Sequence, residues 1–252
     1  NLIGTINDIK TICKKAKNAK ILTYIDAVQL APHVAIDVQE IDCDFLVCSS
    51  YKFFGPHQGI LWGRKEIMQT LQPYKVRPAT SELPGSFETG TQSHEGMAGT
   101  TAAVDYFAWI GKEFAGQFQK EHAFDRQRTK YVHAALDYLF EYEKLLTLYL
   151  IEGLINLKKI KIQGITQSDA MDRRLPTVSF SVDGVHPEEI ATELGKNNIF
   201  VWSGHSYAIE VVKSLGLYEN GGVIRTGPVH YNSIEEIKEF LKILESILTT
   251  KQ

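Results

Sequence analysis

The sequence predicts an α/β protein whose first part carries a mainly parallel sheet and whose last part forms a smaller α+β domain. Helical and strand patterns alternate through residues 9–63, as they do in α/β sheets. The run DFLVC (44–48) is apolar throughout, as expected for a strand inside a parallel sheet. After a long helical pattern the composition changes to alternating strands and amphipathic helices, which indicates a second domain.

The first elements follow from spacing and turn residues. Ile9, Ile12, Cys13 and Ala16 recur at helical spacing and predict a helix between Asn7 or Asp8 and Ala19. Three strands are predicted after it, at 21–26, 44–48 and 59–63.

A long loop and two helices are expected next. Residues 72–95 carry five prolines and glycines, too many for regular structure. Loops of such length in compact domains usually have a function or are disordered. Helical patterns follow at 96–111 and at 118–145.

The remaining chain predicts the smaller domain. Its predicted elements are a strand at 175–184, a helix at 186–198, a strand at 199–204, a strand and turn at 221–232, and a helix at 233–248 that opens with the capping box Ser233-x-x-Glu236. We therefore expect one domain over residues 1–117 and another over 118–252, including the linking helix.

Composition narrows the possible functions. The chain has 252 residues and a net charge of −3, so it has no basic footprint for nucleic acid or an anionic membrane. No apolar run is long enough to span a bilayer, and no signal peptide is evident. The odd count of three cysteines, without metal-type spacing, favours a reducing, cytoplasmic setting. The chain begins without methionine and enters a helix almost at once, so we expect it to be N-terminally incomplete.

An acid and an amine are predicted on one rim of the sheet. Asp26 ends one strand, and Lys52 follows another in the stretch SSYKFFGPHQGILWG (49–63). The carboxyl ends of parallel strands are where open α/β sheets bind ligands. An ion pair, or two solvated strand ends, is the alternative interpretation.

The order of these motifs resembles the class V aminotransferases. The segments DAVQLAPH, SYKFFGPHQGILWGR, FETGTQSHEGMAGTTAAVDY and GGVIRTGPVHYNSIEEI carry the resemblance through nearly the whole chain. These are fold-type I pyridoxal-phosphate enzymes, and the similarity is greatest to their cysteine desulfurase and selenocysteine lyase branch. The resemblance implies pyridoxal 5′-phosphate as cofactor and begins partway through the family's large domain.

The family's cofactor residues match positions of this chain. Lys52 matches the lysine that holds the cofactor as a Schiff base, where a desolvated amine is the better nucleophile and proton carrier. Asp26 matches the acid that keeps the cofactor ring nitrogen protonated. Gln29 resembles the residue that hydrogen-bonds the ring hydroxyl, and His33 has at most a supporting role.

Three hydroxyl residues match phosphate-binding positions. Ser49 matches a phosphate-binding serine, and Tyr51 stands where the desulfurases have a phosphate-binding histidine. Thr91 matches a threonine that reaches the phosphate across a dimer interface, so the resemblance implies a homodimer with shared sites. Loop capping is the alternative role for Ser49 and Thr91.

Substrate residues are implied in the second part of the chain. Arg225 matches the arginine that grips the α-carboxylate of an amino-acid substrate, although a surface charge is the alternative. Asn1 matches an asparagine near the same carboxylate. His205 is an acid or base near the substrate, or a loop histidine.

The match to the desulfurases breaks at their nucleophile. Their motif R-x-G-H-H-C aligns with WSGHSYAIE (202–210), where Tyr207 stands in place of the cysteine. Persulfide formation requires a thiolate. Cys13, Cys43 and Cys48 precede this part of the chain and are expected to be structural.

The resemblance thus implies an enzyme that acts on a small amino acid by Schiff-base and quinonoid chemistry, without a persulfide cysteine. Elimination, transamination and racemisation stay open. The alternative is a non-catalytic or truncated member that acts by binding or dimerisation. A nucleotide-binding domain is disfavoured, because neither G-x-G-x-x-G nor a Walker motif occurs.

Overall fold

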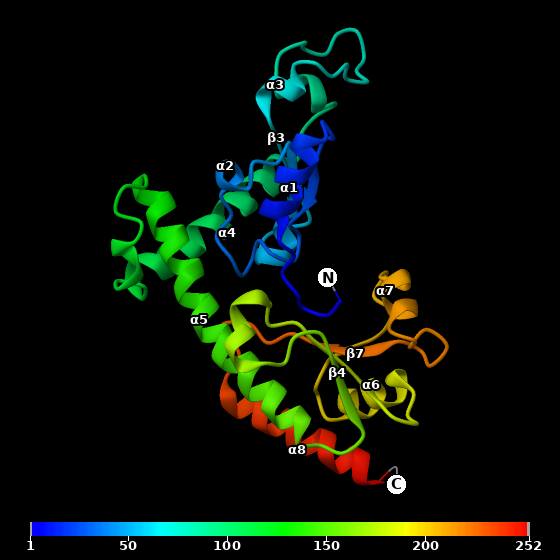
Figure 1. The fold of residues 1–252 in the computed structure, drawn as a ribbon. Helices are drawn as coiled ribbons and strands as arrows, with labels where there is room; N and C mark the ends of the chain where they lie inside the picture. Colours follow the sequence, from blue (N-terminus) through cyan, green and yellow to red (C-terminus); the bar gives the residue numbers. More distant parts are fainter. Residues whose placement is uncertain (1, 251–252) are drawn as a thin grey trace. The chain divides into compact units, whose positions relative to one another are not determined.

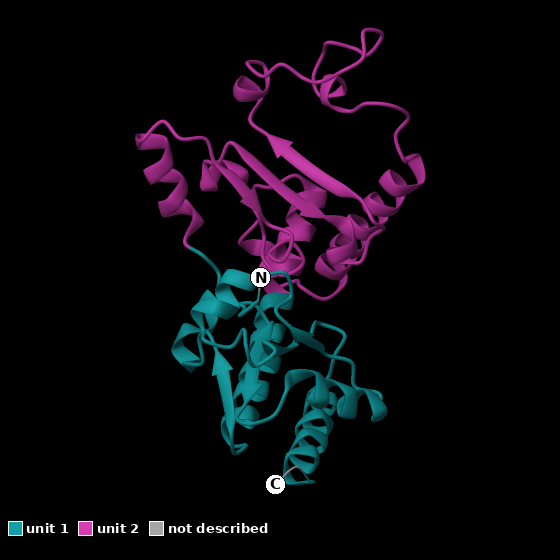
Figure 2. Ribbon diagram, turned by 90° about the vertical axis from the view of Figure 1, so that its right-hand side faces the viewer, with its two compact units in different colours: residues 1–7, 139–252 teal, residues 8–138 magenta. Residues whose placement is uncertain are grey.

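The structure is a computed structural model that describes residues 2–250 (Figure 1). Contacts divide the chain into two compact units (Figure 2). Unit 1 comprises residues 1–7 and 139–252, and unit 2 comprises residues 8–138. We expected the domain boundary at residue 118. The division between the two units falls farther along the chain, between Tyr138 and Leu139, and the expected boundary stays a prediction.

Unit 2 carries a three-stranded sheet in the order β1-β2-β3. Strand β1 (Tyr24–Asp26) runs parallel to β2 (Phe45–Ser49), whereas β3 (Gly59–Gly63) is antiparallel to β2. The segment between β2 and β3 is too short for a crossover, so β3 returns in the opposite direction. The sheet is therefore mixed, with one parallel and one antiparallel pair.

Two helices pack on β2, of which the first was predicted from its apolar spacing. Helix α1 (Ile9–Asn18) begins after Asp8, whose side chain accepts a hydrogen bond from the Thr11 N–H at 3.1 Å. The helix buries Cys13 in a small core that also holds side chains of the short helix α2 (Val38–Ile41) and of β2.

The expected long loop is present and extends away from the sheet of unit 2 (Figures 1 and 2). The short helix α3 (Lys65–Met68) precedes it, and it contains the 3-10 turn η2 (Gly85–Phe87). It ends at α4 (His94–Glu113), where the Ser93 hydroxyl accepts from the Gly96 N–H at 3.2 Å.

The long helix predicted at 118–145 is displaced. The 3-10 turn η3 (Phe118–Lys120) comes first, and helix α5 runs from Gln127 to Ile155. The Gln119 amide donates to the carbonyl of Gly111 at 2.7 Å, which ties η3 to the end of α4. At its other end α5 continues because apolar side chains as far as Leu154 enter the core of unit 1.

Unit 1 is built on an antiparallel sheet in the order β4-β5-β7-β6. Its strands are β4 (Ile160–Gln163), β5 (Val178–Val182), β6 (Trp202–Gly204) and β7 (Val223–Thr226). Helices α6 (Pro187–Lys196), α8 (Ile234–Thr250) and the second half of α5 pack on this sheet. Two shorter elements complete the unit, namely the 3-10 helix η4 (Ser168–Arg173) and α7 (Ile209–Ser214).

The strand predicted at 175–184 is observed as β5, which is shorter than expected and is buried along its whole length. Phe180 and the valines of β5 belong to the core beneath the helices. On the intervening positions, the Ser179 hydroxyl donates to the carbonyl of Leu2, so the N-terminal segment covers a serine position. The other serine of the strand, Ser181, accepts from the Gln163 side-chain amide at 3.5 Å, so both buried hydroxyls have partners.

The capping box at the start of α8 is confirmed. The Ser233 N–H donates to the Glu236 carboxylate at 2.7 Å, and the Glu236 N–H donates to the Ser233 hydroxyl at 3.2 Å. The strand predicted at 199–204 is shorter than expected, because Phe200 is 85% exposed and only Trp202–Gly204 pairs with β7.

Candidate active site

The carboxyl ends of β1 and β2 lie at one edge of the sheet in unit 2, because these strands are parallel. Asp26, the last residue of β1, is the register partner of Val47. Its side chain is exposed, and its Oδ1 accepts from the Val28 N–H at 2.9 Å. This contact holds the carboxylate over the turn that follows β1.

Lys52 lies in the 3-10 turn η1 (Ser50–Phe53), directly after β2. The turn is held by Ser50, which is fully buried and whose hydroxyl donates to the carbonyl of Pro56 at 2.6 Å. The Ser50 N–H donates to the Gln58 carbonyl at 2.9 Å, and the Gly55 N–H donates to the Ser50 carbonyl at 2.8 Å. The lysine is thus half-buried on a turn whose backbone is fixed from both sides.

Glycine is required at position 55 by the closeness of this turn. A Cβ at Gly55 would lie 2.9 Å from the Ser50 Cβ and 3.1 Å from the Ser50 carbonyl oxygen. Both separations are shorter than ordinary carbon contacts. The Gly55-Pro56 pair therefore lets the chain fold back against Ser50.

Tyr51 lies beside the lysine and stacks on His57, with ring centroids 5.0 Å apart and planes 19° apart. The Lys52 Nζ lies 5.1 Å from the Tyr51 ring centroid, a cation–π distance. The tyrosine is 45% exposed, so its ring is accessible from solvent.

The other expected cofactor residues also lie in unit 2. Ser49 is the last residue of β2 and is partly buried opposite Gly59. Gln29 is partly buried in the turn after β1, and His33 is buried at 5% exposure. Thr91 is exposed, just before α4.

Arg225 lies on β7 in unit 1, where it is the register partner of Ser179 on β5 and of Trp202 on β6. The side chain is partly buried, and burial lowers the pKa of its guanidinium. Desolvation of this kind favours an anionic partner close to the guanidinium. Asn1, the other expected substrate residue, lies outside the described residues.

His205 follows β6 in a loop with unusual backbone conformations. Its Nδ1 accepts from the Tyr207 N–H at 3.1 Å, and its ring stacks on Tyr218. Ser206 and Tyr207 have φ of 46° and 63°, and the side chain of Tyr207 is 99% exposed. The loop therefore presents to solvent the phenol of Tyr207, the residue that the sequence resemblance pairs with the desulfurase cysteine.

The three cysteines have the environment of core residues. Cys13 and Cys43 are buried in the core of unit 2, and Cys48 is partly buried on β2. Burial raises the pKa of both Cys43 and Cys48, which disfavours their thiolates at neutral pH.

Two features of the structure were missed by sequence reasoning. One is Ser50, which adjoins the predicted serine and holds the lysine turn. The other is a group of two histidines and two aspartates around the start of α5. For the second, the spacing of His133 and Asp137, one helical turn apart, was the available signal.

Within residues 2–250, no helix is long and apolar enough to cross a bilayer.

Comparisons with known proteins give one family. Residues 1–141 and 128–240 match the family model described as aminotransferase class-V. A probable cysteine desulfurase of Synechocystis sp. is 30% identical over 98% of this chain and 55% of its own length. The aminotransferase-like protein FGM3 of Gibberella zeae is 32% identical over 98% of this chain and 57% of its own length.

Solved structures of similar proteins agree with this match. An apo cysteine desulfurase from Thermococcus onnurineus NA1 superposes with a TM-score of 0.82 at 27% identity, covering 99% of this chain and 58% of that chain. The Escherichia coli cysteine desulfurase CsdA has a TM-score of 0.77 at 20% identity, covering 99% of this chain and 57% of that chain, and shows the shared fold. The chain thus spans little more than half the length of the relatives it matches.

Proposed function

This chain belongs to the class V aminotransferase family and has its fold-type I α/β architecture, and from that premise we propose that it is a pyridoxal-phosphate-dependent enzyme acting on a small amino acid. The observation that carries the proposal is the placement of Asp26 at the end of β1 and of Lys52 directly after β2, because these two strands are parallel and hydrogen-bonded. An amine and a carboxylate at one sheet edge are the pair that this cofactor needs.

The residues of unit 2 fit the cofactor chemically. Lys52 is half-buried on a fixed turn and supplies the amine that anchors the aldehyde. Asp26 is exposed and held over the following turn, where it supplies the carboxylate for a ring nitrogen. When bound, pyridoxal phosphate supplies an electron sink for bond breaking at the amino-acid Cα. The role of Lys52 is then to take up and return the Cα proton through Nζ.

The phosphate and ring hydroxyl have candidate partners beside the lysine turn and in the turn after β1. Ser49 and Tyr51 flank the buried Ser50 and offer hydroxyls at the end of β2, and Gln29 offers an amide in the turn after β1. The stacking of Tyr51 on His57 orients the phenol that replaces the family's histidine. Thr91 is exposed, as a residue that reaches the phosphate of a second subunit must be, and we propose a homodimer on this basis.

Substrate recognition is assigned to unit 1. Arg225 binds the α-carboxylate, and its partial desolvation increases the strength of such a charge-assisted hydrogen bond. His205 acts as an acid or base near the substrate. Asn1 is assigned to the same carboxylate on the family resemblance alone. We also retain the cytoplasmic location expected from the unpaired cysteines.

The sulfur-transfer step of the desulfurases is not part of the proposal. Tyr207 stands at the position of their cysteine, and the cysteines of this chain are in or beside the core of unit 2. The proposed enzyme releases its product directly. The alternative, a non-catalytic or truncated member that acts by binding or dimerisation, is distinguished by cofactor retention.

The test is the visible absorption spectrum of the purified protein with added pyridoxal phosphate, beside Lys52→Ala. A visible band that the variant lacks, and a borohydride-stable link to the peptide containing Lys52, are the expected results. A matched control is Lys65→Ala, which removes an exposed lysine of the same unit. A colourless wild-type protein, or label distributed equally over other lysines, would refute the enzyme and favour the alternative.

A further inference from the structure

A second cluster of ionisable side chains surrounds the start of α5 in unit 2, and none of its members belongs to the candidate active site. His122 and Asp125 lie in the turn between η3 and α5. His133 and Asp137 follow on α5 itself, one helical turn apart. The cluster therefore joins a turn to the helix that it precedes.

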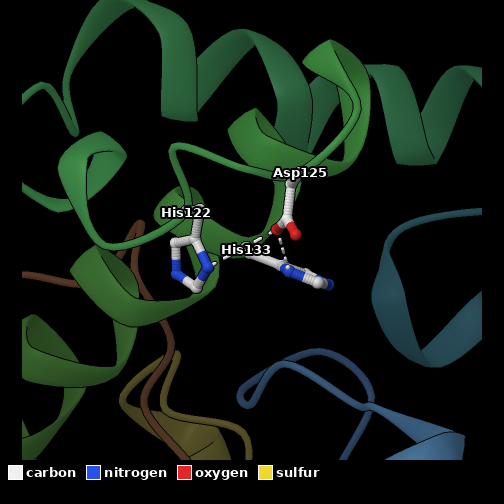
Figure 3. A group of neighbouring side chains, drawn as sticks. All are labelled: His122, Asp125 and His133. Atoms are coloured by element: carbon white, nitrogen blue, oxygen red, sulfur yellow. Dashed lines mark hydrogen bonds and ion pairs between the residues drawn. The ribbon is translucent and has the colours of Figure 1, made fainter.

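The side chains of this cluster converge on one carboxylate. Asp125 Oδ2 lies 2.9 Å from His133 Nδ1 and 3.5 Å from His122 Nδ1. One ligand atom from each of the three residues lies within 4.8 Å of the other two. Figure 3 shows both rings directed at Asp125, with dashed lines to its carboxylate.

The fourth member, Asp137, orients His122. Its Oδ2 lies 2.6 Å from His122 Nε2, so this nitrogen carries the proton and donates it to the carboxylate. In the neutral ring, Nδ1 then presents its lone pair toward Asp125. A lone pair and a carboxylate oxygen repel each other, and a cation between them converts this repulsion into coordination.

We propose that His122, Asp125 and His133 bind a divalent transition-metal ion of the zinc type, with Asp137 as a positioning residue. Zinc–nitrogen and zinc–oxygen bonds of about 2.0–2.2 Å in tetrahedral geometry place ligand atoms about 3.4 Å apart. The separation of 3.5 Å between Asp125 and His122 is close to that value. The 2.9 Å contact between Asp125 and His133 is a hydrogen-bond distance, which lengthens when an ion replaces the proton between the two atoms. Imidazole nitrogens select zinc-like ions over magnesium or calcium, which prefer oxygen ligands.

The role of Asp137 is typical of metal sites. A ligating histidine usually donates its other ring N–H to a carboxylate, which fixes the tautomer and the ring orientation. The charges also balance, because two carboxylates and two neutral imidazoles match one divalent ion. With three protein ligands, water completes the coordination. The side chains of His122, Asp125 and His133 are 21%, 33% and 24% exposed, so an ion reaches them without unfolding.

The bound ion would act as a structural clamp. It links the turn at 122–125 to the first turns of α5, so it stabilises the beginning of this helix. Binding to the folded state alone raises stability with metal concentration. The clamp is independent of cofactor and substrate, and loss of pyridoxal-phosphate binding would leave it intact.

The test is calorimetric titration of the tag-free, chelator-treated chain with zinc, in buffer without phosphate or pyridoxal phosphate. We expect one zinc per chain, and an affinity at least about 100-fold lower in two variants. His133→Ala removes a ligand nitrogen, and Asp125→Asn replaces the anionic ligand by a neutral, weakly donating amide oxygen. Asp137→Asn keeps all three ligands and is expected to weaken binding about 10- to 100-fold. His186→Asn, which removes an exposed histidine of unit 1, is the matched control and should bind as wild type does.

Cobalt substitution identifies the ligands. A site of nitrogen and oxygen donors gives visible cobalt bands without a sulfur charge-transfer band in the near ultraviolet. Zinc should also raise the thermal midpoint of wild type but not that of Asp125→Asn. The proposal is overturned if wild type binds no zinc, if Asp125→Asn and His133→Ala bind it as tightly as wild type, or if a sulfur band places the metal on cysteine. If His133→Ala does not fold by circular dichroism, the isosteric Asp125→Asn decides alone.

Discussion

Replacing Ser50 by alanine tests whether the turn that carries Lys52 is held as the structure indicates. The Ser50 side chain is fully buried, and its hydroxyl donates to the Pro56 carbonyl at 2.6 Å and approaches the Gln58 carbonyl at 3.3 Å. Both carbonyls keep another donor, because the Gln58 N–H donates to Pro56 at 2.8 Å and the Ser50 N–H donates to Gln58 at 2.9 Å. The substitution therefore strands no buried acceptor.

The expected loss follows from that geometry. A buried hydrogen bond whose acceptor keeps a second donor contributes about 1 kcal/mol, less than the cost of a fully unsatisfied carbonyl. With a denaturant slope of about 2 kcal/mol/M, the urea midpoint should fall by about 0.5 M. Ser81→Ala, at an exposed loop position of the same unit, should leave the midpoint unchanged.

The functional consequence is measured on the same protein. Lys52 lies two residues after Ser50 within η1. A loosened turn should therefore let pyridoxal phosphate be lost during dialysis, even in buffer without urea where the variant stays folded. Urea unfolding followed by circular dichroism gives the stability, and the visible band gives cofactor retention. A Ser50→Ala protein equal to wild type in both would refute the inference that this hydroxyl holds the lysine turn.

Three further perturbations test the packing and the thiols. Gly111→Ala should destabilise the protein by more than about 3 kcal/mol, because a Cβ there would lie 1.8 Å from the Tyr131 carbonyl oxygen. Gly195→Ala on α6 meets no atom within 4 Å and should stabilise the protein by about 0.5–1 kcal/mol. The two variants should shift the urea midpoint in opposite directions, and shifts in the same direction would contradict the prediction. Arg174→Met should lower the free energy of unfolding by about 2–4 kcal/mol, because the buried guanidinium donates to three backbone carbonyls. A loss below about 1 kcal/mol would show that these carbonyls find other donors. Burial raises the pKa of the Cys48 thiol above that of a free cysteine, about 8.5, so the neutral thiol persists as the pH rises. The alkylation rate of Cys48 in the native protein should therefore still be increasing at about pH 9, as mass spectrometry of the labelled peptide would show. A plateau at lower pH would contradict the burial argument.

The local sequence was sufficient to predict the boundaries of elements that begin or end at glycines or at a helix cap. Glycines bound β3 at both ends, and its predicted range matches Gly59–Gly63. Ser233 and Glu236 supply the start of α8 with a reciprocal cap that any reader of the sequence can recognise. In these cases the residues that determine the boundary lie within the element or beside it.

Boundaries set by distant contacts were not predictable. Helix α5 begins after η3 because Gln119 is tied to the end of α4, and it continues to Ile155 because its last turns enter the core of unit 1. Phe200 has the apolarity of a strand residue but is exposed. The cluster at His122 also depends on a distant contact and was therefore not predicted. Its partner Asp137 becomes a neighbour only when the turn folds back on the helix.

The separation of the candidate residues between two units makes the proposed roles independently testable. Every described residue proposed for the cofactor lies in unit 2, whereas Arg225 lies on β7 of unit 1. Arg225→Leu should therefore leave the visible band of bound cofactor unchanged. If the guanidinium binds the α-carboxylate, its loss removes a charge-assisted hydrogen bond of about 2–3 kcal/mol, which is about 100-fold in the concentration of L-alanine or L-cysteine that perturbs the band.

The controls for this prediction decide between charge and packing. Arg225→Lys keeps a cation but not the planar fork and should recover part of the loss, whereas Arg225→Gln should recover little. A structural role for the guanidinium would instead lower the urea midpoint and leave amino-acid affinity equal among variants that still fold. If amino-acid affinity falls as predicted, the substrate carboxylate stabilises the charge of a guanidinium whose pKa is lowered by burial.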